Sequence, residues 1–198
     1  MNFLFSPPSL DDLIHLLKAW RFWVLGALVG SLIGAATYYI APPPYRARAV
    51  VNVDFNFEQA FPENTDRQDF YYLEREARKL VELAWSDDVL SQLNLPADEL
   101  RDGKLNLSQP AEAGWHFYAD DRDPQQAEEL ASAWATAFVE KAQAEIKAGN
   151  IHELVRLEVT QSNKLPKERS VPLSNYLLAG TFGFSLLAVF FVLFVKTK

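Results

Sequence analysis

Two long apolar segments lie near the two ends of this 198-residue chain. Phe22–Ile40 is 19 residues without a charged side chain, and Leu173–Val195 is 23. At about 1.5 Å of rise per residue, the shorter segment extends roughly 28 Å as a helix, close to the hydrocarbon thickness of a bilayer. The sequence therefore predicts two transmembrane helices with one polar domain, 41–172, between them.

Two spans place both ends of the chain on the same side of the membrane. Basic residues flank the spans on both sides, so counting them does not set the orientation. Because large domains translocate largely regardless of charge and the first helix usually dominates, we expect 1–21 and 196–198 in the cytoplasm and 41–172 outside it. A cleaved signal peptide is disfavoured, since Asp11 and Asp12 precede an apolar run that exceeds the usual length of about 7–15 residues.

The domain between the spans is acidic. It holds 15 of the 19 basic and 24 of the 26 acidic residues, a net charge of −9. That charge argues against nucleic acid as a partner and against docking of the domain on anionic lipid. The chain contains no cysteine, which excludes disulfides, thiolate catalysis and cysteine-ligated zinc.

Periodicity within the domain predicts an α+β fold. Apolar side chains alternate along three segments that we interpret as strands, Ala47–Phe55, Lys104–Ser108 and Gly114–Ala119. Leu154–Gln161 alternates in the same way and is predicted as a fourth strand, although a continued helix to about residue 160 fits the same residues. Because the first and last strands both adjoin a span, we expect them close together in a small mixed sheet packed by helices.

Helical signals fall between these strands and before the first span. Asp123 followed by Pro124 is typical of a helix start, and Gly149 of a helix end. Ser9 and Asp12 fit a capping box ahead of an amphipathic lead helix. The other predicted helices are Asp66–Trp85, a short helix from Ser86 to Leu93, and a turn from Pro96 to Arg101.

No motif in the sequence predicts an active site. Asp120, Asp121 and Asp123 suggest a cation site, but a turn that ends in a helix N-cap explains them better. The three histidines lack the spacing of metal ligands, and there is no Gly-x-Ser-x-Gly, Walker-type or His-Glu-x-x-His motif. We therefore expect no catalytic residue, cofactor or metal.

Small residues recur at every fourth position of the first span. Gly26, Gly30 and Gly34 give that helix a smooth face, and Ala179 and Gly183 repeat the spacing in the second span. Such faces let helices approach closely enough for backbone van der Waals contact, the main attraction available inside lipid. We expect these residues to pack transmembrane helices together. The partner helix belongs to the same chain, to another copy or to a second protein.

In their order and spacing these features resemble the chain-length determinant (Wzz-type) polysaccharide co-polymerases. The resemblance covers nearly the whole chain, and its motifs are individually weak. The residues that carry it are the lead Leu10–Trp23, the exit from the first span Pro43–Ala49, the segment Ser86–Pro96, the helix start at Asp121, Asp123, Pro124 and Ala127, and the return with Pro166, Pro172, Gly180 and Gly183.

The resemblance implies a periplasm-facing α+β base domain, ring-like homo-oligomers and a non-enzymatic function. That function is to set the length of a surface polysaccharide, such as O-antigen, capsule or exopolysaccharide, made by a separate membrane polymerase. The growing polysaccharide or its lipid-linked precursor is a further implied partner. Pro44 and Tyr45 would mark the exit from the first span, and Pro166 and Pro172 the return to the second.

Two departures from that family pattern change the expectation. Family members usually carry a long helical arm, whereas here Gly149 ends the helix shortly before Pro166. No tyrosine-rich tail or kinase domain follows Val195. We therefore expect a short member that consists of the base domain and the two spans.

Two other function classes fit two spans around one domain. A sensor would signal through a cytoplasmic partner docked on 1–21, because only 196–198 follow the second span. A membrane-anchored glycan enzyme would need an essential Asp, Glu or His in the domain, and the sequence nominates none.

Overall fold

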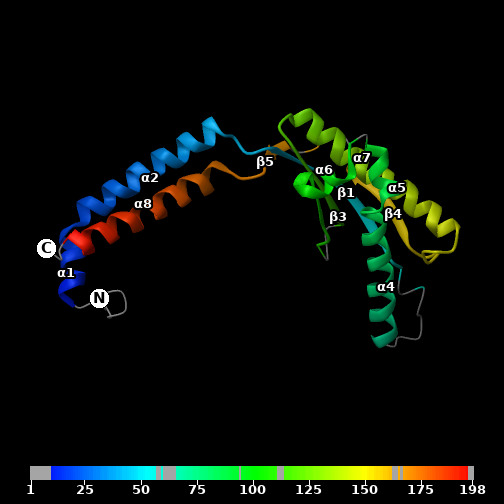
Figure 1. Cartoon of the computed structure of the whole chain (residues 1–198). Coiled ribbons are helices and arrows are strands. Elements are labelled where there is room, and N and C mark those ends of the chain that lie inside the picture. The colour runs from blue at the N-terminus through cyan, green and yellow to red at the C-terminus, as the bar shows by residue number, and fades with distance from the viewer. Residues whose placement is uncertain are drawn as a thin grey trace. The chain divides into compact units, whose positions relative to one another are not determined.

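The computed structural model describes residues 10–56, 59, 66–93, 95–110, 114–161, 165 and 167–195. The chain divides into two compact units (Figure 1). One unit is Pro44–Ser170, and the other combines Met1–Pro43 with Val171–Lys198. The unit boundaries lie within three residues of the ends of the predicted polar domain.

The unit built from the two ends of the chain is a helical hairpin. It contains α1 (Leu10–Lys18), α2 (Trp20–Ile40) and α8 (Leu173–Val195), and α2 and α8 lie side by side (Figure 1). By length and composition, two helices suit a membrane span, Trp20–Ile40 and Leu173–Leu193. The predicted cap residue of α1, Ser9, lies outside the described residues.

The surface of the hairpin is apolar as well as its interior. Large side chains such as Leu32 and Phe182 are 70% and 65% exposed. A helix that is apolar all round is suited to an apolar environment rather than to water. The hairpin therefore matches the interior of a bilayer better than a soluble surface.

Pro44–Ser170 folds as an α+β unit around one sheet. The strands are β1 (Tyr45–Asp54), β2 (Leu105–Ser108), β3 (Trp115–Asp121), β4 (Arg156–Gln161) and β5 (Lys167–Arg169). Their order is β2-β3-β1-β4, and β5 pairs with the beginning of β1. The first strand thus lies beside β4, the last predicted strand, as expected, and also beside β5, which was not predicted.

All the described strand pairs are antiparallel, so the prediction of a mixed sheet is wrong. The reason is connectivity. β2 and β3 are joined by a short connection, which favours an antiparallel pair, and β4 and β5 return along β1 in the opposite direction.

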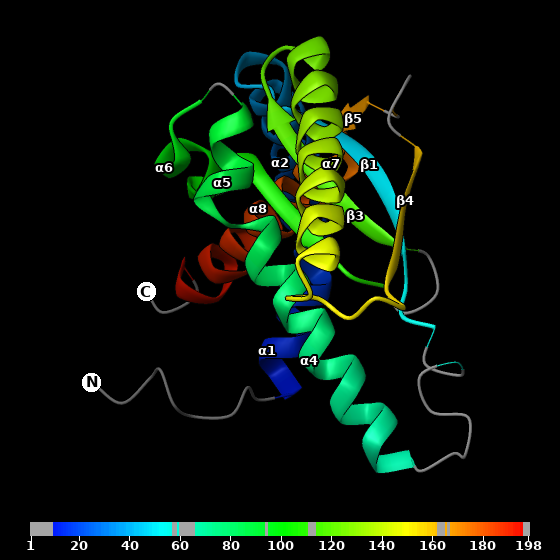
Figure 2. The ribbon, with the colours of Figure 1, turned by 90° about the vertical axis from the view of Figure 1, so that its right-hand side faces the viewer.

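The helices of this unit are α4 (Asp66–Ala84), α5 (Asp87–Leu90), η1 (Ser91–Leu93), α6 (Ala97–Glu99), η2 (Leu100–Lys104) and α7 (Pro124–Lys147). The longest, α7, lies across one face of the sheet, over β1 and β3 (Figure 2). Its start is as predicted, because the Asp123 carboxylate accepts a hydrogen bond from the Gln125 backbone N–H at 2.8 Å and Pro124 is the first helical residue.

Aromatic side chains fill the space between α7 and the sheet. Trp134, Phe117 and Phe138 are fully buried, and the rings of Phe117 and Trp134 are 4.8 Å apart. The Trp134 indole N–H donates to the carbonyl oxygen of Ala84 at 2.9 Å, which ties α7 to the end of α4. One core thus joins the sheet, α7 and α4.

The ambiguous segment after α7 is a strand. The helix ends at Lys147, and Gly149 follows with a φ of +79°, in the left-handed region that favours glycine. Arg156–Gln161 then forms β4 beside β1, so the alternative of a continued helix is wrong.

Candidate functional site

Three glycines of α2 face α8 at a distance that leaves no room for a side chain. A Cβ added to Gly26 would stand 2.9 Å from the Cβ of Ala188. A Cβ on Gly30 would overlap the carbonyl oxygen of Gly180, and one on Gly34 would overlap that of Tyr176. The partner of this smooth face is therefore the other long helix of the same chain.

The small residues predicted for the second span do not form this contact. Gly180 does, because a Cβ there would overlap the carbonyl oxygen of Gly30. Ala179 and Gly183 are exposed, and a Cβ on Gly183 would meet nothing within 4 Å. Positions 176, 180 and 184 share the face toward α2 at the spacing of four, and residues one position away are turned by about 100°. We call Gly26, Gly30, Gly34 and Gly180 the α2–α8 seam.

The predicted exit from the first span lies where the polar unit begins and ends. The backbone N–H of Ser170 donates to the carbonyl oxygen of Pro44 at 2.9 Å. Tyr45 is paired in register with Arg169, whose guanidinium lies 3.7 Å from the centre of the tyrosine ring. These contacts hold the first and last residues of the unit together.

Of the two prolines predicted at the return to the second span, the structure describes Pro172. Pro172 immediately precedes α8, and its carbonyl oxygen accepts a hydrogen bond from the backbone N–H of Asn175 at 3.1 Å. It therefore stands at the start of the helix. Pro166 lies outside the described residues.

The aspartates considered as a cation site have structural roles. Asp120 accepts two hydrogen bonds of 2.7 Å from the guanidinium of Arg46. Asp121 accepts from the backbone N–H of Asp123, and Asp123 caps α7. The interpretation as a turn and N-cap is confirmed for Asp121 and Asp123, whereas Asp120 lies in β3. Within the described ranges, no group of three or more His, Asp or Glu side chains could hold a metal ion.

A buried carboxylate that the sequence did not reveal joins α4 to the segment after α7. The side chain of Glu76 is fully buried. It accepts hydrogen bonds from Arg75 Nε at 2.9 Å, Lys79 Nζ at 3.1 Å and the His152 backbone N–H at 3.1 Å. Lys79 also donates to the carbonyl oxygen of Asn150 at 2.7 Å. Glu76 thus fixes the chain between α7 and β4.

The hydrogen bonds keep this carboxylate ionised. Burial, the largest single effect, raises the pKa of Glu76, but the bonds from His152, Lys79 and Arg75 together outweigh it and lower the pKa below its ordinary value. The next buried side chain on the same stripe, Tyr72, donates to the Phe55 carbonyl oxygen at 3.0 Å. Glu76 and Tyr72 each bond to a backbone group of the same domain, so both side chains hold the fold together.

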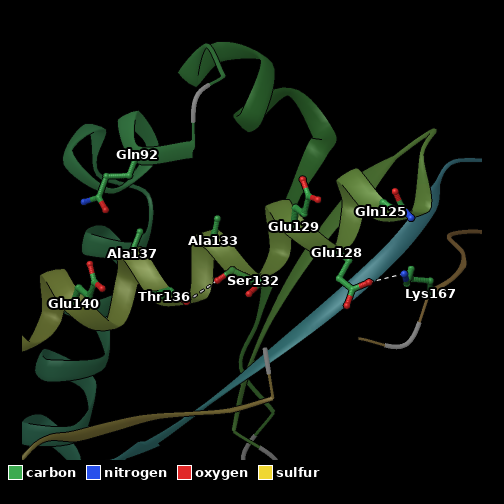
Figure 3. A pocket seen from close by; sticks show the side chains of 10 residues that line it. All are labelled: Gln92, Gln125, Glu128, Glu129, Ser132, Ala133, Thr136, Ala137, Glu140 and Lys167. Carbon is green, nitrogen blue, oxygen red and sulfur yellow. Dashed lines mark hydrogen bonds and ion pairs between the residues drawn. The ribbon is translucent and has the colours of Figure 1, made fainter. Parts of the chain in front are cut away.

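An open groove of about 750 Å³ runs along the outer face of α7 (Figure 3). Lys167 closes one end through an ion pair with Glu128. Glu129 and Glu140 lie on the same helix face, eleven residues or roughly 16 Å apart, which exceeds the carboxylate separation of glycosidases. The lining is polar and small: Gln92, Gln125, Glu128, Glu129, Ser132, Ala133, Thr136, Ala137, Glu140 and Lys167. The groove therefore offers mainly hydrogen-bonding groups.

Comparison of the chain with protein-family models and with curated proteins found no match. The packing role of Gly180 and the burial of Glu76 were not predicted from the sequence. Gly180 lies one residue from the predicted Ala179, and only the pairing of α2 with α8 selects it. Glu76 stands four residues after Tyr72 and four before Leu80, so its place on a buried stripe was readable from the spacing.

Proposed function

We propose that this chain is a non-enzymatic membrane scaffold that regulates the length of a surface polysaccharide. In this proposal it lies in the cytoplasmic membrane with Pro44–Ser170 outside the cytoplasm. Copies of the chain assemble into a ring-like homo-oligomer, and the oligomer engages a separate membrane polymerase. The growing polysaccharide or its lipid-linked precursor would meet the domain during synthesis.

The observation that carries the proposal is the architecture, an α+β domain inserted between the two helices of an apolar hairpin. Such an insertion needs the two ends of the domain to be adjacent. The hydrogen bond from Ser170 to Pro44 and the pairing of Tyr45 with Arg169 meet that need. The order of span, strand, helices, strands and span is also the order on which the resemblance to the co-polymerases rests.

The α2–α8 seam supports the proposal from the side of the membrane. Because the glycines of α2 pack on α8 of the same chain, each copy carries a preformed two-helix unit. Ala179 and Gly183 on the outer surface of that unit remain accessible to a second hairpin. Close helix approach is the main source of association within lipid.

The domain's carboxylates also fit a scaffold better than an enzyme. Glu76 and Asp120 are held in hydrogen bonds to cations, and Glu128 pairs with Lys167. A carboxylate that serves as a general acid or base must instead reach a substrate. These groups are used to hold the fold.

Two measurements on the full chain test the proposal. The mass of the complex in mild detergent, read by native mass spectrometry, should correspond to a defined multiple of the 22.5 kDa chain. Deletion of the gene in the producing cell should change the length distribution of a surface polysaccharide on a gel while polymer is still made. A monodisperse monomer together with an unchanged length distribution would refute the proposal.

A further inference from the structure

The face of the sheet opposite α7 carries polar and aromatic side chains. On β1, Ala47 and Ala49 are fully buried in the core with α7, and the residues between them point to the other face. The pairing of β1 with β3 places Arg46 opposite Asp120, Arg48 opposite Tyr118 and Val50 opposite His116. The pairing of β2 with β3 places Asn106 on the far side of Tyr118. We call Arg46, Arg48, Asn106, His116 and Tyr118 the open sheet face.

The ring of Tyr118 is held on two sides. The guanidinium of Arg46 lies 5.6 Å from the centre of the ring, and Arg46 is itself fixed by two hydrogen bonds of 2.7 Å to Asp120. On the other side, the Tyr118 hydroxyl is 3.2 Å from Nδ1 of His116. An aromatic ring fixed before a ligand arrives loses little side-chain entropy on binding.

Among the described residues, Arg48 beside this ring has no ionic partner. The half-buried lysines and arginines in the described part of the chain are Arg46, Arg48, Lys79, Lys104, Lys141 and Arg169. Five of them form an ion pair or a cation–π contact. The Arg48 side chain makes no hydrogen bond or ion pair with any residue that the structure describes. An unpaired, half-buried guanidinium is locally complementary to an anionic group brought from outside, although the domain as a whole is acidic.

The groups of the open sheet face match the parts of an acidic sugar. A tyrosine ring presents an apolar surface to the C–H face of a pyranose, and the Asn106 amide can bond its hydroxyls. The planar fork of Arg48 suits a carboxylate, which it can bind through two parallel N–H···O bonds. Arg46 and Asp120 neutralise each other, and β5 places Glu168 opposite Arg46, so Arg48 is the cation of this face that is left for a ligand.

We propose that the open sheet face binds a uronic acid unit of a polysaccharide, with the sugar ring on Tyr118 and its carboxylate on Arg48. This inference rests on the proposed function, because it names the class of polymer that the scaffold would contact. A single ring and a single free guanidinium match one or two sugar units. A stable protein interface buries roughly 800 Å² per partner, which is larger than such a platform.

Calorimetric titration of the full chain in lipid nanodiscs tests this assignment, with hexagalacturonate as the acidic probe and maltohexaose as the neutral one. We expect heat of binding with the acidic probe and an affinity at least about tenfold lower for the neutral one, since a charge-assisted bidentate contact is lost. R48Q and Y118A should each weaken the acidic probe about tenfold or more. Y118F keeps the ring and should stay within about threefold of the unmodified chain.

The control is R78Q, which removes an exposed arginine on α4, and it should leave the affinity unchanged. Unchanged thermal transitions would show that R48Q and Y118A are folded. Equal affinity in R48Q, Y118A and the unmodified chain would overturn the assignment. Full competition by inorganic phosphate at the same concentration would also overturn it, because the site would then recognise a small anion. A smaller complex for R48Q in native mass spectrometry would reassign the face to a contact with a second copy.

The outcomes separate this inference from the proposed function. If deletion of the gene alters polymer length but hexagalacturonate does not bind, the scaffold stands and the sugar site fails. If hexagalacturonate binds through Arg48 and Tyr118 but deletion leaves polymer length unchanged, the site stands and the scaffold function fails.

Discussion

Replacement of Gly30 by alanine should loosen the α2–α8 seam. A Cβ at this position would stand 2.7 Å from the Cβ of Phe184 and from the carbonyl carbon of Gly180. Non-bonded carbon atoms prefer about 3.5–4.0 Å, so the two helices would have to separate locally by about 1 Å. The atoms in the way belong to backbone and to a Cβ, which cannot turn aside as the end of a flexible side chain can.

The cost of that separation follows from the loss of packing. A gap of about 0.5–1 Å removes roughly a quarter to a half of each dispersion contact, and overpacking typically costs about 1–3 kcal/mol. A loss of this size shifts the equilibrium between packed and separated helices by a factor of about 5 to 150. Alanine should therefore weaken the hairpin although it is the better helix former.

The absence of native cysteine makes a cross-linking assay direct. The rings of Tyr38 and Tyr176 are 5.5 Å apart, so cysteines at these two positions can be joined by a short bis-methanethiosulfonate, which forms a disulfide with each thiol and releases methanesulfinate. We expect intramolecular cross-linking to fall at a lower SDS fraction in G30A than in the unmodified seam. G183A is the matched control, since a Cβ there meets nothing within 4 Å. Equal SDS midpoints for G30A and the parent, or an equal shift in G183A, would refute the reasoning.

Three further predictions concern the domain. E76Q should lower the free energy of unfolding by about 1–3 kcal/mol, because it replaces the charged acceptor of three hydrogen bonds. Chemical denaturation measures this change, and an unchanged midpoint would contradict the role of Glu76. The lowered pKa of Glu76 means that its contribution is complete above its unfolded value, near 4.5, and is lost as the pH falls through the folded value; E76Q should therefore show a shallower loss of stability with acid than the parent. G114A should lower the free energy of unfolding by about 2 kcal/mol or more, because φ is +74° and the new Cβ would lie 2.9 Å from the Val51 carbonyl oxygen. G149A has φ +79° and open space around the new Cβ, so it should lower the free energy of unfolding by only about 1–2 kcal/mol. Equal thermal shifts of the two variants would show that the contact with Val51 carries no cost.

The strands and helices were predictable because their burial follows the local period. On β1 the buried positions are every second residue, as the alternation of Ala47, Ala49 and Val51 indicated. The start of α7 was predictable for a similar reason, since Asp123 and Pro124 act on their immediate neighbours. Strand direction was not predictable from such local signals, because it depends on how distant segments pair.

The seam and the open sheet face mark the limit of what one sequence shows. The face of α2 was visible as a repeat of glycines, but its counterpart Gly180 is set by the rotation of α8 against α2. Arg48 and Tyr118 are seventy residues apart in sequence and meet through the register of β1 with β3. No pattern within either segment encodes that register. That Arg48 lies beside Tyr118 without an ionic partner among the described residues could therefore be recognised only in the folded domain.

The placement of the domain outside the cytoplasm can be decided by labelling single cysteines. If α2 and α8 each cross the membrane once, Lys18 at the end of α1 and Glu153 in the turn after α7 lie on opposite sides. Both positions are exposed, and the chain has no other thiol. We expect a membrane-impermeant maleimide to label E153C in cells with a permeable outer envelope and K18C only after the inner membrane is opened.

The reverse pattern would place the domain in the cytoplasm and remove its access to an exported polysaccharide. Equal labelling of both in closed cells would show that the hairpin does not cross the membrane. Because the labelling of each variant in closed cells is divided by its own labelling after the inner membrane is opened, the ratio is independent of expression level and reports topology.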